Sequence, residues 1–139
     1  YKKKKEYHKK SLQKRLKNNP FLKLRMYVSR NIYKMLKRNK ASKSGLSCLQ
    51  FLPYSIQELR SYVEGKFEDW MNWDNWGIYN PETWDDNDKS TWTWQLDHIV
   101  PQSKLPYLTM SEDNFKICWS LSNLQPLSAK QNILKGNKV

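Results

Sequence analysis

Apolar side chains recur at helical spacing in the first third of the chain and predict one amphipathic helix. The helix covers about residues 21–40, and its apolar face consists of Leu24, Val28, Ile32, Met35 and Leu36. Residues 18–20 (NNP) come directly before it, and Pro is tolerated in the first turn of a helix. Residues 2–17 are so charged that we expect them to order only on a partner, and residues 41–45 are expected to form a linker.

A second helix is predicted to begin after Ser55. Ser55 and Glu58 fit a capping box, and the apolar positions that follow fall on one face: Ile56, Leu59, Val63 and Phe67. We expect this helix to end near Trp70. Tryptophans then crowd residues 70–94 among Asn, Asp, Gly and Pro, which predicts a long loop anchored by aromatic side chains. Core packing is favoured for these indoles, with stacking on nucleobases as the alternative.

Helical spacing gives way to strict alternation at residues 92–97 (WTWQLD), which predicts a half-buried strand ending in Asp97 and His98. Pro101 cannot donate to a sheet, so the backbone must leave the sheet just after His98. Adjacent side chains can then converge on one site. A carboxylate and an imidazole at a strand end are a candidate metal ligand and a candidate base.

Three short elements are predicted beyond this strand. Ser111 is expected to cap a helix that runs to about residue 119, and residues 123–127 (NLQPL) form an extended segment. A last helix follows, with residues 128–131 (SAKQ) as a second capping box and residues 133–134 (IL) facing inward. The order strand, loop, strand, helix, preceded by helices, predicts an α+β fold.

Charge divides the chain into unlike parts. The 139 residues carry a formal net charge of +12, and residues 1–50 hold 17 Lys or Arg and one acid. Residues 51–97 reverse the balance with ten acids and three bases, and they include an acidic run at 85–88 that lacks the Gly and Glu of a calcium loop. The basic surplus favours a polyanion as partner over a merely solvated surface. We therefore divide the chain into a basic helical nucleic-acid-binding arm, residues 1–50, and a second unit, residues 51–139.

Linked motifs in this second unit resemble the HNH endonucleases, in the His-Asn-Asn variant common among bacteriophage and intron-encoded nucleases. Residues 96–101 (LDHIVP) look like the first half of the family motif. Residues 123–127 (NLQPL), with Asn132, Lys135, Gly136 and Lys138 after them, look like the second half. The resemblance also reaches back to the helix at residues 54–70.

The resemblance implies a small ββα-metal (HNH) nuclease core over residues 51–139 and assigns roles within it. His98 would be the general base, Asp97 and Asn132 would bind one divalent ion, and Asn123 would brace the loop. Two oxygen ligands leave most of the coordination sphere for water and phosphate, which favours Mg²⁺ or Mn²⁺. No structural zinc is expected, because Ser128 and Gln131 stand where many family members carry Cys.

Taken together, these observations predict a metal-dependent DNA endonuclease acting on double-stranded DNA. The basic residues expected to contact nucleic acid are Arg25, Arg30, Lys34, Lys37, Arg38, Lys130, Lys135 and Lys138. For the last three, ordinary exposed lysines are an equal alternative.

Two other functions stay open: a nucleic-acid-binding module without catalysis, and the nuclease portion of a larger mobile-element or packaging protein. The first residue is Tyr1 rather than Met, so we expect a longer reading frame. No apolar run approaches the roughly 18 residues of a membrane span. We accordingly expect a soluble chain in the cytoplasm, or at the nucleoid of a host cell if the protein is viral.

Overall fold

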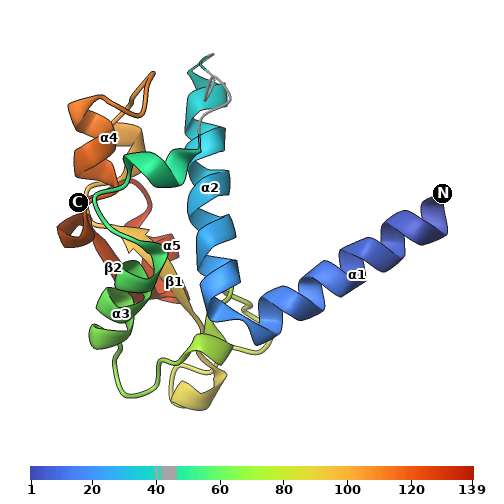
Figure 1. The fold of residues 1–139 in the computed structure, drawn as a ribbon. Coiled ribbons are helices and arrows are strands. Elements are labelled where there is room, and N and C mark those ends of the chain that lie inside the picture. The colour runs from blue at the N-terminus through green and yellow to red at the C-terminus, as the bar shows by residue number, and fades with distance from the viewer. Residues whose placement is uncertain (40, 42–46) are drawn as a thin grey trace.

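The computed structural model describes residues 1–39, 41 and 47–139, with the backbone alone at residues 16–18. Helices come first along the chain, and a pair of strands flanked by short helices follows (Figure 1). The α-helices and strands are α1 (Lys2–Asn18), α2 (Pro20–Arg38), α3 (Ile56–Gly65), β1 (Trp94–His98), α4 (Asp113–Cys118), β2 (Leu124–Ser128) and α5 (Ala129–Lys135). The fold is therefore α+β, as predicted.

Helix α2 confirms the amphipathic helix expected at about residues 21–40. The Asn19 side chain caps it by accepting a hydrogen bond from the Leu22 amide at 3.1 Å, and Pro20 occupies its first turn. All five apolar positions predicted for its inner face are buried. The predicted linker at residues 41–45 lies outside the described residues except for Ala41, which packs against the core.

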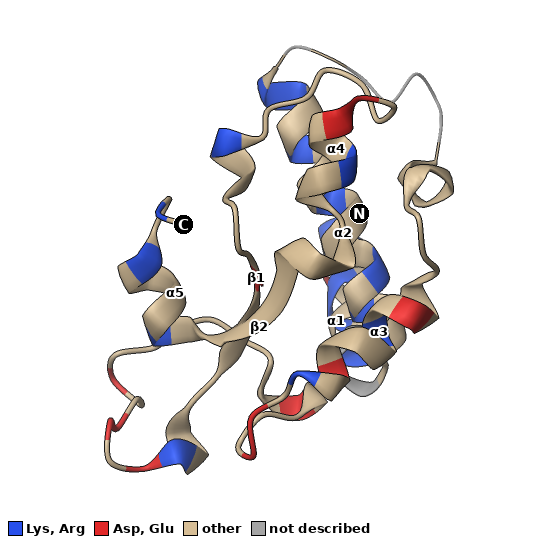
Figure 2. Ribbon diagram, turned by 90° about the vertical axis from the view of Figure 1, so that its left-hand side faces the viewer, with Lys and Arg blue, Asp and Glu red and all other residues tan. Residues whose placement is uncertain are grey.

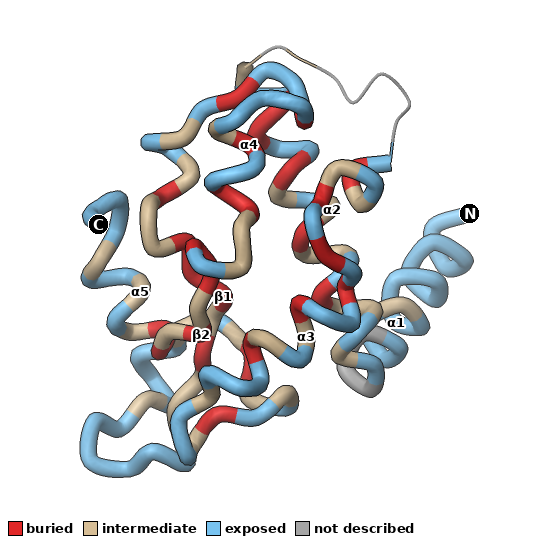
Figure 3. The backbone as a smooth tube through the Cα atoms, turned by 60° about the vertical axis from the view of Figure 1, so that its left-hand side comes forward, coloured by how far each residue is buried: buried red, intermediate tan, exposed pale blue. Residues whose placement is uncertain are grey.

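Helix α1 was expected to order only on a partner, yet residues 2–18 are helical here and project from the body (Figure 1). Lys, Arg, Gln and Leu are good helix formers, so no residue interrupts the helix before Asn19 and Pro20. Because α1 has no continuous apolar face, almost all of its described side chains are exposed (Figure 3).

Helix α3 begins as predicted, since Ser55 and Glu58 form both hydrogen bonds of a capping box. It ends at Gly65, and the expectation that it runs to near Trp70 is wrong. Phe67 leaves the helical path and packs at ring distances of 5.1 Å from Trp73 and 5.0 Å from Trp94. The packing of Phe67 in this aromatic cluster accounts for a helix that ends about five residues earlier than expected.

Strands β1 and β2 form a two-stranded antiparallel sheet in which Asp97 pairs with Gln125 and His98 with Leu124. Helix α5 follows β2 directly. The Ser128 hydroxyl caps it by accepting a hydrogen bond from the Gln131 amide, and Gly136 ends it with a positive φ of 54°. The predicted order of strand, loop, strand and helix is confirmed.

One hydrophobic core joins α2, α3, the sheet and α4 (Figure 3). Trp94 is fully buried, and Trp76 stacks on it at 5.2 Å with an interplanar angle of 15°. Core packing is thus confirmed for these two indoles. Trp84 and Trp92 stack on each other and are half-buried beside the acidic run at 85–88, which is exposed as expected.

Two predictions about the C-terminal helices are wrong. Ser111 does not cap α4; the residue at the cap position is Glu112, whose carboxylate instead accepts hydrogen bonds from the Leu108 and Thr109 amides. Ile133 and Leu134 do not face inward, because they are 60% and 70% exposed.

In the packing, α2 belongs to the same core as the rest of the body, while α1 lies outside it. The division at residue 50 therefore stays a prediction about function and does not coincide with a gap in the core. Among the helices in the described part of the chain, none is long and apolar enough to cross a membrane.

Candidate functional site

Three residues predicted to form the site line one cavity of about 280 Å³ at the end of β1, and we call this the His98 cavity. Asp97 and His98 come from β1, and Asn132 comes from α5. Arg38, the last residue of α2, and Tyr27, near the middle of that helix, also line the cavity. The fold thus brings together residues that are more than 90 positions apart in the sequence.

The Asp97 carboxylate is buried and bound on both oxygens. The Lys135 ammonium donates to Oδ1 at 2.9 Å and to Oδ2 at 2.8 Å, and the Gln125 amide donates to Oδ2 at 2.9 Å. Lys135 also donates to the His98 carbonyl at 2.6 Å. The side chains of Lys135 and Asp97 are only 15% and 7% exposed, so this ion pair is largely shielded from water.

Polar contacts of this kind explain the orientation of α5. Ala129, Asn132 and Lys135 recur every three residues and therefore share one face, which meets the sheet. The Asn132 amide donates to Gln95 Oε1 on β1 at 2.7 Å. Because Lys135 and Asn132 have partners on β1, the apolar pair at residues 133–134 is left on the outer face.

His98 is buried and lies edge-on to the Trp119 indole, with ring centroids 4.5 Å apart. Its Nε2 is buried and makes no hydrogen bond to any residue that the structure describes. Burial lowers the pKa of the imidazole to about 4; the negative charge of Asp97 opposes this shift and the positive charge of Lys135 adds to it. The imidazole is therefore neutral at neutral pH and can accept a proton.

Asn123 lies beside the site and does not line the His98 cavity. Its Oδ1 accepts a hydrogen bond from the Val100 amide at 2.8 Å, and its Nδ2 donates to the carbonyls of Val100 and Cys118 at 3.2 and 3.0 Å. The Asn123 carbonyl also accepts from the Ile99 amide. Asn123 thus holds the backbone that follows His98 and fixes where the chain leaves the sheet.

The five cations predicted on α2 are exposed, and the structure sorts them by position. Arg38 lines the His98 cavity, and Arg30 and Lys34 line a larger groove beside it. Arg25 and Lys37 line neither. Figure 2 shows Lys and Arg along α2 and on α5, whereas Asp and Glu lie on the lower loops, on α3 and at the start of α4.

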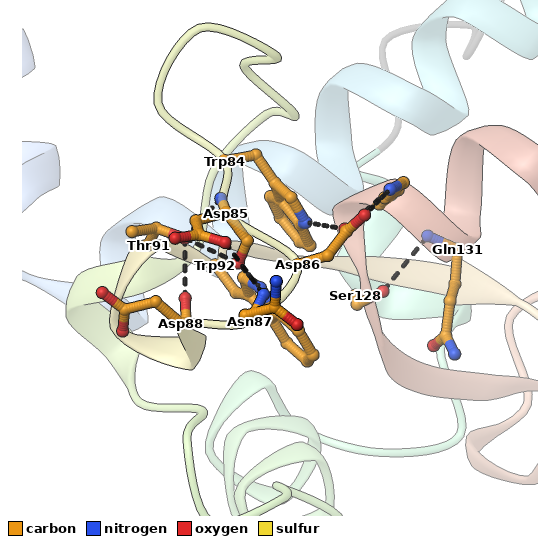
Figure 4. A network of polar contacts seen from close by, with 10 residues as sticks. Trp84, Asp85, Asp86, Asn87, Asp88, Thr91, Trp92, Ser128 and Gln131 are labelled. Carbon is orange, nitrogen blue, oxygen red and sulfur yellow. Dashed lines mark hydrogen bonds and ion pairs between the residues drawn. The ribbon is translucent and has the colours of Figure 1, made fainter.

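The three C-terminal lysines also differ from one another. Lys135 is tied to Asp97, as described above, and Lys138 is exposed beyond the end of α5. Lys130 does not line the His98 cavity, and its ammonium contacts both carboxylate oxygens of Asp86 at 2.6 and 2.7 Å. Figure 4 shows this acidic turn, in which the Trp84 indole also donates to Asp86, and the Ser128 cap beside it.

Sequence reasoning did not predict that Gln125 and Lys135 contact the Asp97 carboxylate. It also did not predict that Tyr27 lines the His98 cavity. Gln125 lies opposite Asp97 across the sheet, and a known strand register would have indicated it. The Lys135 pair had no signal in the sequence beyond a basic residue near the last motif position. Tyr27 donates to the Leu96 carbonyl at 3.2 Å, and it was hidden within a helix read only for its apolar face.

No protein-family model matches this chain, and no solved structure matches it. The chain is similar to an uncharacterized protein of Acanthamoeba polyphaga mimivirus, with 27% identity over 108 residues. The match covers 78% of this chain and 39% of the mimivirus protein, so the chain spans about two fifths of that relative's length.

Replacing Lys135 tests the buried ion pair. Lys135→Met leaves the Asp97 carboxylate buried without its cation, and we expect the free energy of unfolding to fall by about 3 kcal/mol. Urea denaturation at neutral pH measures the change. Lys138→Met, three residues further on and exposed, is the matched control and should be neutral.

Adding Asp97→Asn to the Lys135→Met protein removes the unpaired charge, and part of the lost stability should return. If Lys135→Met and Lys138→Met had the same free energy of unfolding, the ion pair between Lys135 and Asp97 would not contribute to stability.

The pKa of His98 predicts a pH-dependent stability. The His98 imidazole has its ordinary pKa of 6.5 in the unfolded chain and a pKa of about 4 in the native state. Between these two pH values the unfolded state therefore binds more protons than the native state. The contribution of His98 is therefore complete above pH 6.5 and is lost as the pH falls toward 4. From pH 7 to pH 5 we expect the free energy of unfolding to drop by about 2 kcal/mol on account of His98.

Denaturation curves at both pH values check this, with each protein compared with itself. His98→Gln should lose most of the dependence, and His8→Ala, which changes an exposed histidine of α1, should keep it. An unchanged pH dependence in His98→Gln would contradict the assignment.

Proposed function

We propose that the chain is a metal-dependent DNA endonuclease in which β1, β2 and α5 form a ββα-metal core of the HNH type. One observation carries the proposal: Asp97, His98 and Asn132 share the wall of one cavity with Arg38. A potential base, two oxygen ligands and a cation suited to phosphate therefore meet at one place. Double-stranded DNA is the proposed substrate, because Arg38 lines this cavity, Arg30 and Lys34 line the groove beside it, and polyanions bind such basic surfaces.

His98 would act as the general base. Hydrolysis of a phosphodiester needs a water molecule that loses a proton as it attacks, and a neutral imidazole can take that proton. Burial keeps the imidazole neutral, and no described residue occupies its Nε2. The perpendicular contact with the Trp119 ring and the backbone held by Asn123 restrict the orientation of the imidazole. Arg38 is placed to contact the phosphate through a charge-assisted hydrogen bond.

The donor set fits a hard divalent cation. Asp97 supplies a carboxylate and Asn132 an amide oxygen on the same cavity wall, and Mg²⁺ or Mn²⁺ takes such ligands together with water and phosphate. When bound, the ion supplies positive charge that stabilises the charge developing on the phosphate and on the leaving oxygen. Lys135 already places one positive charge on both Asp97 oxygens, so an ion has to share this carboxylate with it.

The same ion pair favours one alternative function. A carboxylate that is fully satisfied by Lys135 and Gln125 is also what a binding site without an ion would contain. A nucleic-acid-binding module without catalysis is therefore the second candidate. A third candidate, the nuclease portion of a larger protein, is favoured by the longer mimivirus relative, of which the match covers 39%.

Incubation of the protein with supercoiled plasmid and Mg²⁺ or Mn²⁺ tests the proposal. We expect nicked or linear plasmid, and no cleavage in EDTA. His98→Ala should reduce the rate by about a hundredfold or more, because removal of a general base has effects of that size. Gel electrophoresis of the plasmid forms against time measures both.

The matched control is His8→Ala, because it removes the second histidine of the chain from the exposed helix α1 and should leave cleavage unchanged. Tight plasmid binding without cleavage in either ion would replace the nuclease by the binding module. Equal rates for His98→Ala and His8→Ala would show that His98 is not the base.

A further inference from the structure

A groove of about 540 Å³ runs between α2 and residues 76–78 and β1, next to the His98 cavity. Its volume lies within the range of about 300–1,000 Å³ that is usual for ligand sites. Tyr27, Leu96 and Asn132 line both the groove and the His98 cavity, so the two adjoin each other. A chain-like ligand lying in the groove would therefore extend into the candidate site.

The groove is positively charged on its α2 side. Lys23, Arg30 and Lys34 line it, and no Asp or Glu is among the described residues that do so. Arg30, Lys34 and Arg38 are spaced four residues apart and hence form one row on the helix, with successive residues about 6 Å apart along its axis. The first two residues of this cationic row line the groove, and the third lines the His98 cavity.

The aromatic side chains of the groove already have partners within the protein. Trp94 stacks on Trp76 at 5.2 Å, and the Lys23 ammonium lies 4.5 Å from the centre of the Trp76 ring while donating to the Trp76 carbonyl at 2.8 Å. Tyr27 meets Trp76 edge-on at 5.7 Å. Stacked nucleobases are therefore not the ligand that this groove fits, and charge selects phosphate instead.

We propose that the groove holds the sugar-phosphate backbone of one DNA strand and that the cationic row directs this strand into the His98 cavity. This inference rests on the proposed function for the direction of the strand, since the cavity is where cleavage would occur. Recognition is by charge, so binding through the groove is independent of base sequence. The helix that carries the row is anchored by its buried face, so the backbone that carries the three cations is fixed before DNA arrives.

Two double variants of the full chain distinguish the groove from a general charge effect. Arg30→Gln with Lys34→Gln removes two members of the cationic row. Lys66→Gln with Lys116→Gln removes two cations from exposed positions that line neither the groove nor the His98 cavity. The net charge falls by the same amount in both variants. Any difference in their DNA affinity therefore depends on where the removed cations lie.

Fluorescence anisotropy with a labelled DNA duplex in EDTA measures affinity at several salt concentrations without cleavage. We expect the row variant to bind about tenfold more weakly and to lose about two units from the slope of log K against log salt, because two phosphate contacts are gone. The control variant should bind almost as the natural sequence does. Equal losses in the two variants, or no loss in either, would overturn the proposal.

A third variant blocks the groove without changing charge. Asn31 lines the groove from α2, and Asn31→Phe fills part of it while leaving every cation in place. We expect weaker DNA binding with an unchanged salt slope, and unchanged affinity would count against the groove.

Because these measurements are made in EDTA, they stand even if the plasmid assay finds no cleavage. Conversely, if the protein cleaves plasmid but the two double variants lose equal DNA affinity, the proposed function stands and the proposal about the groove is overturned.

Discussion

The contact between Asp97 and Lys135 is the interaction on which the candidate site depends. Helix α5 has seven residues and buries only Ala129, so neither its length nor its apolar surface would hold it against the sheet. It is attached instead by the Ser128 cap, the Asn132 contact with Gln95 and the Lys135 ion pair. Two of the groups in these contacts, Asp97 and Asn132, also line the His98 cavity, so the loss of either group affects both the helix and the cavity.

Helix α2 combines two roles that are usually separated. Its apolar face completes the core, and its opposite face presents cations beside the cavity. Flexible basic tails lose conformational entropy when they bind DNA, whereas side chains on a packed helix lose much less. The part of the basic arm nearest the site is therefore rigid, and α1 provides a further basic surface outside the core.

Burial sets the chemistry of the two neighbouring residues at the end of β1 in different ways. Asp97 is stabilised as a buried carboxylate by a cation and an amide, whereas the buried His98 imidazole packs against Trp119 and stays neutral at neutral pH. A carboxylate that holds positive charge beside an imidazole that can accept a proton is the combination that the proposed hydrolysis requires. Asn123, which directly precedes β2, holds the backbone just after His98 through hydrogen bonds with the Ile99 and Val100 amides.

Local features were predictable because their causes are local. The apolar period of α2, the Ser55 cap and the alternation before Asp97 each lie within a few turns or a few residues, and the structure contains all three elements. The sequence by itself also placed Asp97 and His98 at a strand end. Tertiary packing decided the rest: where α3 stops, which face of α5 meets the sheet, which cation pairs with Asp97, and which cations of α2 lie beside the cavity. The periodicity of one segment shows which face is apolar but not which partner that face meets, and residues separated by 38 positions, such as Asp97 and Lys135, meet only through the packing of the whole chain.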